Sequence, residues 1–558
     1  MQGHNWRAIV YIRIEMLRFK SQESVITSHC RLGYLASANA LTPLVHQASS
    51  RLYNIKYVRY VNNRRLTSTK QHTTKRENST LSHTYIHTCT QKMVSLVAKN
   101  SIRCLHPKPC LPKPRHFSNT CHVQIMSTSN LTQTQLDIRT AIQSLCTSFP
   151  NSYWRTHDAS AKDPTSFHAA LATNGWLGIA LPERFGGSGL GISEATMMMQ
   201  TISESGAGMA GAQAVHGNVY ATQPLVRHAS AEMCSELVPR IVSGEVRVCF
   251  GVTEPGSGLD TLGLKTVAVR EGDEYVISGE KVWITAAQVA GYMILLARTS
   301  SSLPSSSSSS SSPAVAVSSS GEDGGDDDDD AKIASKAQRS KSHGLSLFCI
   351  PLNRQTPGLE IRKIRKMGGR AVDANQVFFD NYRVPASSLI GAENNGFRII
   401  LQGMNAERCL LAGEALGLGY CALSRAADYA RSRTVFNRPI GMNQGIAHPL
   451  ADAYMALEAA KLATYHAASL YDQSQQEGSA VTQDVVGVAA NSAKYLAAEA
   501  AFRACERAVL THGGMGYADE YDVERWFRES LVPRIAPVSR EMILNYVGEK
   551  VLGLPRSY

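Results

Sequence analysis

The feature that most constrains the fold is the period at which apolar residues recur, because this period changes twice along the chain. From about residue 128 to 247 the apolar residues follow the helical repeat of about 3.6 residues. Between 248 and about 388 they occur in short runs rich in Val, Ile, Phe and Tyr, which are typical of strands. From about 391 the helical repeat returns, in blocks at 407–433, 448–473, 485–511, 520–532 and 538–552.

This order predicts an α+β fold with three domains. We expect an N-terminal helical domain at 126–247, a middle β domain of barrel-like or sandwich form at 248–390, and a C-terminal four-helix bundle at 391–558. Inside the middle domain, the runs Thr266–Arg270 and Tyr275–Ser278 alternate as strands do, and Gly272-Asp273 supplies a tight turn between them. A β-hairpin is therefore predicted there.

Residues 299–343 form a low-complexity insert in the middle domain. The insert contains eight consecutive serines (Ser305–Ser312) and five consecutive aspartates (Asp326–Asp330). Such a segment has too little apolar surface to offset the entropy lost on ordering. We expect a disordered surface loop between two strands, without a role in chemistry.

The net charge of +11 comes from the first 125 residues, which hold 19 Lys and Arg against 3 Asp and Glu. The remaining chain carries 38 basic and 43 acidic residues, so it offers no general attraction for nucleic acid. A leader rich in Arg, Ser, Thr and His but poor in acids is typical of a mitochondrial transit segment, and Arg115-His116-Phe117-Ser118 resembles a matrix-protease site. We expect location in the mitochondrial matrix; a disordered basic tail without an address is the alternative.

Two further classes of protein are disfavoured by the sequence. No uninterrupted apolar run approaches the roughly 20 residues of a membrane span. Of the 12 cysteines, five lie in the leader, and none forms a CxxC or a Cys/His cluster with zinc spacing. We therefore expect neither a membrane span nor a metal site nor a disulfide framework.

Four separated motifs occur in the predicted domains. The first runs from Gly175-Trp176 through Pro182-Glu183 to Gly186–Gly189, and the second joins Cys249–Gly258 with Gly279–Thr285. The third is Arg433–Phe436 with Gln444, and the fourth is His512–Tyr517. In this order they resemble the acyl-CoA dehydrogenase family, over about 430 residues from Ser127 to the C-terminus.

The resemblance implies FAD as the cofactor, with its ring system held at strand edges in the middle domain. Phe250, Val252, Thr253, Trp283 and Thr285 match positions that line the flavin, where Trp283 covers the ring and polar groups stabilise its reduced form. Ser539 matches a Thr near the flavin. The alternative is that Phe250 and Trp283 belong only to the core of the sheet.

A second set of matches implies that the enzyme is a homo-oligomer, either a dimer or a tetramer. Arg433, Phe436 and Gln444 match positions that reach the adenine and diphosphate of FAD bound to a neighbouring subunit, and Gly513 and Gly514 leave room for a dinucleotide. The alternatives are a solvated Arg433 at a helix C-terminus and a glycine pair that only stops a helix.

The resemblance also requires a catalytic base. Many members carry it as a Glu in the C-terminal segment, where this chain has Pro537. A minority, including isovaleryl-CoA and long-chain acyl-CoA dehydrogenases, hold it on the first long helix of the C-terminal domain, directly before an Arg. Glu407-Arg408 stands at that place, so Glu407 is the predicted base, with Asn405 and Arg408 as substrate-binding residues. Glu414 lies seven residues further on much the same face and is a rival acid, and the alternative for Glu407 is a solvated carboxylate at a helix start.

The function that the resemblance implies is α,β-dehydrogenation of an acyl-CoA thioester to trans-2-enoyl-CoA. Glu407 would abstract the α-proton while hydride passes from Cβ to flavin N5, and electron-transferring flavoprotein would accept the electrons. A base on the helix favours branched or longer acyl groups, as used in fatty acid β-oxidation or branched-chain amino acid catabolism. The alternatives are a catalytically silent FAD- and acyl-CoA-binding subunit or assembly factor, and an oxygen-using acyl-CoA oxidase.

Overall fold

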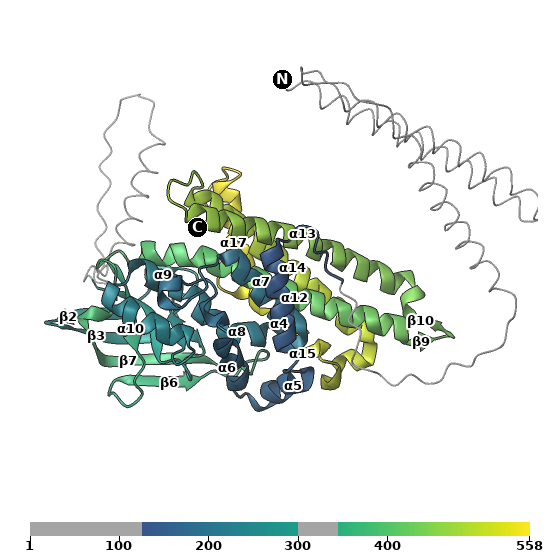
Figure 1. Ribbon diagram of the computed structural model, residues 1–558, viewed down its shortest axis with the longest axis horizontal. Helices are drawn as coiled ribbons and strands as arrows, with labels where there is room; N and C mark the ends of the chain where they lie inside the picture. Colours follow the sequence, from purple (N-terminus) through teal and green to yellow (C-terminus); the bar gives the residue numbers. More distant parts are fainter. Residues whose placement is uncertain (1–124, 300–343, 558) are drawn as a thin grey trace, which may run out of the picture. The chain divides into compact units, whose positions relative to one another are not determined.

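The computed structural model describes residues 125–299 and 344–557 (Figure 1). The predicted leader, up to residue 124, and residues 300–343 of the insert lie outside the described residues. The N-terminal domain is helical, as expected, and consists of α4 (Gln133–Cys146), α5 (Asn151–Ser160), α6 (Thr165–Thr173), α7 (Ile192–Ile202), α8 (Gly208–Tyr220), α9 (Thr222–His228) and α10 (Ala231–Val242).

The long apolar-periodic stretch at 194–221 is divided into α7 and α8 rather than forming one helix. Between them, Ser203–Ala207 form a short π-helical segment in which Gly206 has φ 101°. Gly208, at the start of α8, has φ 66°. Residues with a side chain rarely adopt positive φ, whereas glycine does so without steric cost. These two glycines therefore allow the chain to change direction here.

The middle domain contains one sheet, and its strands are β1 (Val248–Gly251), β2 (Val267–Glu271), β3 (Glu274–Thr285), β4 (Tyr292–Arg298), β5 (Leu345–Pro351), β6 (Leu359–Lys363), β7 (Ala374–Pro385) and β8 (Leu389–Ile390). Their order is β6-β7-β3-β2-β4-β5-β8, and β1 pairs with β4 in parallel. The predicted hairpin is confirmed: β2 and β3 are antiparallel, with Glu271 opposite Glu274 across Gly272, which has φ 62°.

Strands β4 and β5 are buried on both faces, which explains why their sequences are continuously apolar. Ile294 and Leu296 belong to the core shared with the N-terminal helices, whereas Met293 and Leu295 belong to the core within the sheet domain. The two strands are antiparallel neighbours and flank the insert, and the backbone N–H of Thr299 donates to Gly344 at 2.9 Å. The expectation that the insert connects two strands is confirmed.

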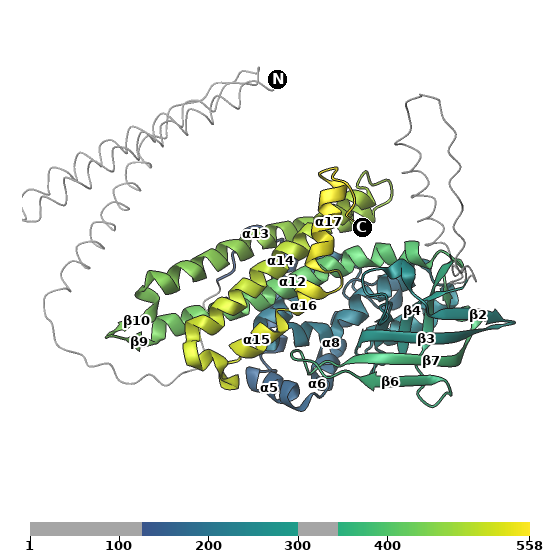
Figure 2. The same cartoon turned by 180° about the vertical axis from the view of Figure 1, so that it is seen from behind.

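The C-terminal domain is helical, with α12 (Gly396–Ser432), α13 (Gln444–Ser474), α14 (Gln483–His512), α15 (Val523–Glu529), α16 (Val532–Ile535) and α17 (Arg540–Lys550). A small hairpin of β9 (Thr434–Val435) and β10 (Arg438–Pro439) follows α12. In Figures 1 and 2, α12 runs from the sheet domain to this hairpin, with α13 and α14 beside it.

Helix α12 begins eleven residues before the predicted start at 407. Its first turns pack on β5, a contact that the sequence pattern does not reveal. Gly396 makes this contact possible, since a Cβ there would collide with the backbone of Ser346. None of the described helices is both long and apolar enough to cross a bilayer.

Candidate active site

Both acids that the sequence singled out converge on one histidine. Glu407 lies in the fourth turn of α12 with 12% of its side chain exposed, so it is not a solvated carboxylate at a helix start. Its Oε1 lies 3.9 Å from Nε2 of His216, which α8 contributes. Glu414 is fully buried, and its Oε1 lies 2.5 Å from Nδ1 of the same imidazole.

The two carboxylates determine the charge of His216. Burial lowers the pKa of His216, but Glu414 and Glu407 outweigh this effect and raise it to about 10. The imidazole is therefore a cation at neutral pH, with both ring nitrogens as donors. His216 was not among the predicted site residues, because a lone histidine in an apolar helix carries no sign of what it faces.

A chain of side-chain contacts joins this cluster to the first strand of the sheet. The ring of His216 lies 4.6 Å from that of Tyr220, and Tyr220 meets Phe250 of β1 edge to face at 5.0 Å. Since α8 packs on β1, Phe250 and Glu407 lie at two ends of one continuous set of contacts. The structure thus brings together a residue of the second motif and the predicted base.

The loop that follows β1 is held by a buried ion pair. Nζ of Lys281 donates to Oε1 of Glu254 at 2.8 Å and to the carbonyl of Val252 at 3.0 Å. The backbone N–H groups of Lys265 and Thr266 donate to the same carboxylate. Burial opposes ionisation of Glu254, but Lys281 and these donors hold its pKa below the usual range, while burial lowers the pKa of Lys281 to about 8 against the pull of Glu254.

Val252, Thr253, Trp283 and Thr285 lie on neighbouring backbone segments. The carbonyl of Thr253 accepts the N–H of Val282 at 2.9 Å, and β1 contacts β3. Trp283 is 58% exposed and has φ 63°, an uncommon conformation for a bulky residue. Trp283 is therefore not part of the sheet core, and its ring presents an open aromatic face, whereas Phe250 is half-buried against the helices.

Behind Glu407 lies a group of buried cations. Nη1 of Arg408 donates to Oδ1 of Asn405 at 2.9 Å, while its Nε has no partner among the described residues. Burial lowers the pKa of Arg408 although Glu407 opposes this. Lys494 of α14 donates to the carbonyl of Val538 at 2.6 Å, and burial together with Arg408 lowers its pKa to about 8.

Ser539 follows this group in the chain and caps α17, where its hydroxyl oxygen accepts from the N–H of Met542 at 3.3 Å. Lys494 thus links the residue before Ser539, whose carbonyl it binds, to Glu407 and Arg408, whose charges act on it.

The other predicted site residues lie far from this cluster within one chain. Arg433 is the C-cap of α12 and lies 26 residues from Glu407, which corresponds to about 39 Å along a helix. Phe436 is 93% exposed, and Gln444 at the start of α13 is also exposed.

The glycine pair Gly513 and Gly514 lies at this same distant end. Gly513 ends α14 with φ 61°, as the alternative of a helix stop expects, and the adjacent His512 stacks on Tyr429 of α12 at 4.2 Å. A Cβ on either glycine would meet nothing within 4 Å, so both face open space.

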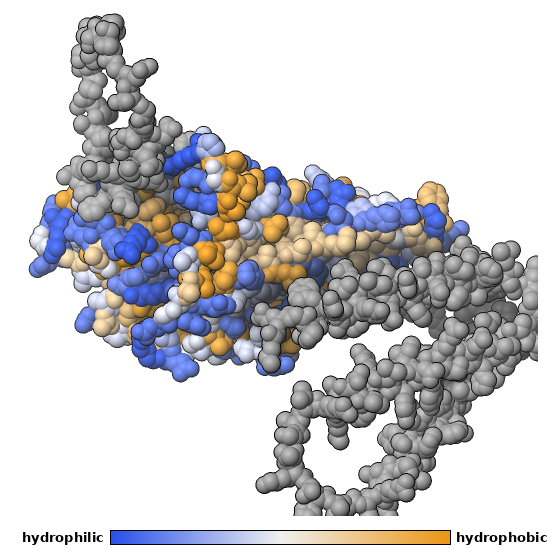
Figure 3. All heavy atoms as spheres, turned by 90° about the horizontal axis from the view of Figure 1, so that it is seen from above, coloured by the Kyte–Doolittle hydropathy of each residue, from blue (hydrophilic) through white to orange (hydrophobic). Residues whose placement is uncertain are grey.

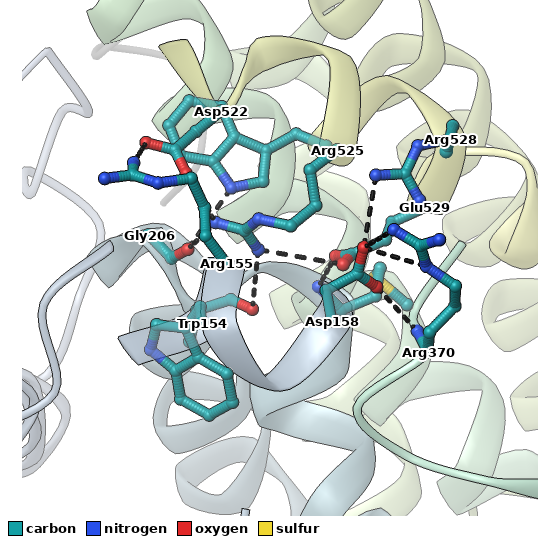
Figure 4. A network of polar contacts seen from close by, with 12 residues as sticks. Trp154, Arg155, Asp158, Gly206, Arg370, Asp522, Arg525, Arg528 and Glu529 are labelled. Atoms are coloured by element: carbon teal, nitrogen blue, oxygen red, sulfur yellow. Dashed lines mark hydrogen bonds and ion pairs between the residues drawn. The ribbon is translucent and has the colours of Figure 1, made fainter. Parts of the chain in front are cut away.

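Helix α8 is anchored at its start by the polar network in Figure 4. Arg525 and the indole of Trp526 both donate to the carbonyl of Gly206, at 2.9 and 3.2 Å. Glu529 accepts the backbone N–H of Met209 at 2.7 Å. These bonds use backbone groups that the break between α7 and α8 would otherwise leave unpaired.

The same network reaches the sheet domain through Asp158 of α5. Asp158 pairs with Arg370 at 2.6 Å and with Arg528 at 3.2 Å, and both guanidinium groups surround its carboxylate in Figure 4. Asp522 pairs with Arg155 at 2.7 Å. Residues from all three domains thus fix the position of α8, and with it His216.

Family models match the chain in the same three parts. The N-terminal, middle and C-terminal domains of acyl-CoA dehydrogenase match residues 132–245, 249–321 and 394–552. Acyl-CoA dehydrogenase FadE12 of Mycobacterium tuberculosis is 32% identical over 424 residues, which cover 75% of this chain and 96% of that protein. Mitochondrial short-chain specific acyl-CoA dehydrogenase of Mus musculus is 29% identical over 67% of this chain and 79% of its own length.

A solved structure shows the same fold. Butyryl-CoA dehydrogenase of Megasphaera elsdenii superposes with a TM-score of 0.65 at 24% identity, over 76% of this chain and 99% of that one. The chain belongs to the acyl-CoA dehydrogenase family, and it is an FAD-dependent oxidoreductase.

Two features of the described residues are suited to binding FAD. Trp283 presents an aromatic face that no protein core covers, next to the strand that carries Phe250. At the far end, open space surrounds Gly513 and Gly514, next to the last turns of α12, where His512 stacks on Tyr429. Among the described residues no cluster of His, Cys, Asp and Glu is arranged to hold a metal ion.

We expect Glu254→Gln to lower the free energy of unfolding by about 3 kcal/mol at pH 7, because it leaves the buried Lys281 ammonium without its partner. Urea unfolding of the FAD-loaded enzyme measures the change. Glu360→Gln, which removes an exposed pair with Arg362, serves as the control and should have no measurable effect.

The pH dependence of this difference has a defined sign. The pKa of Glu254 is depressed in the folded protein, so its contribution is complete above the ordinary value of 4.5 and is lost as the pH falls through the folded value. Equal unfolding free energies of the wild type and Glu254→Gln at pH 7 would contradict the assigned role of the pair.

Proposed function

We propose that the enzyme oxidises the Cα–Cβ bond of an acyl-CoA thioester to trans-2-enoyl-CoA and that Glu407 removes the α-proton. The observation that carries this proposal is the continuous contact from Glu407 through His216 and Tyr220 to Phe250. These contacts connect the Glu407 carboxylate to β1, the strand that carries Phe250 of the proposed flavin site. A base must lie within hydrogen-bond reach of the proton it abstracts, and this position allows it.

The flavin would be held by Phe250, Val252, Thr253, Trp283 and Thr285, with the Ser539 hydroxyl near it. When bound, FAD supplies the acceptor for the hydride that leaves Cβ. The chain's own contribution is to orient the thioester and to keep water away from Glu407, whose side chain is only 12% exposed.

Arg408 and Asn405 are the substrate-binding residues in this proposal. Among the described residues, Nε of the buried guanidinium has no hydrogen-bond partner, and Arg408 lies next to the base in the chain. A buried donor without a partner is costly, and a carbonyl oxygen of the substrate is a suitable acceptor for it. The neighbouring ammonium of Lys494 adds positive potential where the α-carbanion character of the reaction needs it.

Replacement of the base tests the proposal. We expect Glu407→Gln to reduce the rate of anaerobic flavin bleaching by acyl-CoA at least about 100-fold, since a positioned general base contributes about 10²–10⁴. The panel should include straight and branched chains of several lengths, because longer or branched acyl groups are the proposed substrates. Glu477→Gln, an exposed carboxylate after α13, is the matched control and should bleach at the wild-type rate.

The other outcomes of this experiment are informative. A wild-type rate in Glu407→Gln would show that another group is the base. If no acyl-CoA bleaches the wild-type flavin, the chain is a silent subunit or assembly factor. Peroxide formed under air at the turnover rate would make it an oxidase, whereas electron-transferring flavoprotein is the acceptor in our proposal.

The separation of about 39 Å between Glu407 and Arg433 supports a homo-oligomer, because one FAD at the Glu407 cluster of a chain cannot be contacted by Arg433, Phe436 and Gln444 of the same chain. In a second copy, these residues and the Gly513-Gly514 pair would meet its adenine and diphosphate. Exposed apolar side chains also lie on the bundle helices, and Figure 3 shows hydrophobic residues gathered on one face of the molecule. The exposed apolar side chains on α13, α14 and α17 include Met455, Leu462, Leu496, Leu510 and Leu544.

Subunit complementation tests the shared site. Glu407→Gln and Arg433→Ala homo-oligomers should each be inactive, the second because it loses FAD affinity. Mixed oligomers should regain activity, since each mixed pair contains one site with an intact Glu407 from one chain and an intact Arg433 from the other. Absence of recovery in mixed oligomers, purified through two different tags, would show that both residues serve the FAD of their own chain.

The proposed location is the mitochondrial matrix. The support is the basic, acid-poor sequence of residues 1–125, which includes the stretch from Met93 that would suffice as a presequence. We expect residues 93–125 fused to a reporter to direct its import into isolated mitochondria in a potential-dependent way, and a version with its Arg and Lys replaced by Gln to remain outside.

A further inference from the structure

The cluster of His216, Glu407 and Glu414 is asymmetric. The imidazole lies 2.5 Å from Glu414 and 3.9 Å from Glu407, so its hydrogen bond goes to the carboxylate that is fully buried. The second oxygen of Glu414, Oε2, has no hydrogen-bond partner among the described residues. The family resemblance accounts for Glu407 but gives no role to the other two residues.

The asymmetry has a consequence for the base. A cation in direct contact with Glu407 would compete with the substrate for the carboxylate, whereas a cation at 3.9 Å leaves its oxygens free. Glu414 holds the cation at that distance by taking the short hydrogen bond. It also compensates the charge of the imidazolium, so the three groups together carry one negative charge.

Other ionisable groups face the cluster from the elements packed against it. Tyr220 of α8 lies beside it, and burial raises the pKa of its hydroxyl. Arg408 of α12 and Lys494 of α14 act on Glu407 from the other side. These groups are one neutral acid and two cations, so Glu407 and Glu414 are the carboxylates that face the His216 cation.

The remaining carboxylates near α8 are engaged elsewhere. Glu204, between α7 and α8, pairs with Arg139 at 2.6 Å, and Glu529 binds the backbone of Met209.

We propose that His216 is a positioning residue for Glu407, and that Glu414 holds its imidazolium at a distance that leaves the oxygens of Glu407 free to accept the substrate proton. The inference rests on the proposed role of Glu407 as the base. It assigns the rival acid Glu414 a supporting role, because its short bond to His216 and its complete burial remove it from contact with substrate.

The proposal predicts shifts of opposite sign in two variants. In His216→Gln the cation is lost and two buried carboxylates repel, so the acid limb of the pH profile for flavin bleaching should move up by about one pH unit. In Glu414→Gln the imidazolium faces Glu407 alone and a like charge is removed, so the limb should move down by a similar amount. A merely structural role would move neither limb, or both in one direction, and either result overturns the proposal. His466→Gln, an exposed histidine on α13, is the control.

A spectroscopic experiment separates this proposal from the assignment of the base. The FAD-loaded enzyme, labelled with ¹⁵N-histidine, is titrated by NMR, and His216 is assigned from its loss in His216→Gln. If that variant does not fold, the loss of the same signal in His216→Asn provides the assignment.

We expect the wild-type imidazolium signal to persist above pH 9 and to titrate at least one unit lower in Glu414→Gln. An ordinary titration near pH 6.5 in the wild type overturns the charge cluster. If instead the signal behaves as expected while Glu407→Gln bleaches normally, the proposed base is wrong and the cluster stands.

Discussion

The close approach of α7 to α12 is the constraint on which the rest of the site depends. A Cβ on Gly413 would collide with the carbonyl of Thr196, and one on Gly417 with that of Gln200, so the two helices touch through glycine backbone. Gly413 lies between Glu407 and Glu414 on the 37-residue helix α12. The same contact therefore fixes the register of both carboxylates against the helices that follow α7, and thereby against His216.

Buried charge is used repeatedly to hold loops and helix ends that apolar packing alone would leave free. Glu254 and Lys281 fasten the loop after β1, and the network around Asp158 and Glu529 fastens the start of α8. Each such group is costly to bury, and it is tolerated because its partners satisfy it. Rigid placement of groups around a reacting carboxylate is what catalysis by orientation requires, since the chemistry depends on distances that must not vary.

The residues of the proposed FAD site fall into two groups at the two ends of α12. One group surrounds Glu407, where helix and strand meet, and the other lies at the β9–β10 hairpin with its side chains exposed. A helix of this length keeps its two ends apart, so in the proposed function the second group serves a cofactor that another chain holds. The length of α12 thus links the proposed chemistry to assembly.

The sequence by itself determined the three-part fold, the β2–β3 hairpin and the common face of Glu407 and Glu414, because these follow from local periodicity and turn chemistry. It did not reveal the break between α7 and α8, the early start of α12 on β5, or His216. Each of these depends on what a segment faces across the molecule. A side chain at Gly206, Gly208 or Gly396, for example, would collide with the backbone or side chains that pack against it. Only the tertiary structure decided that a histidine on one helix stands between two acids on another, since periodicity assigns a residue to a face but does not say what packs there.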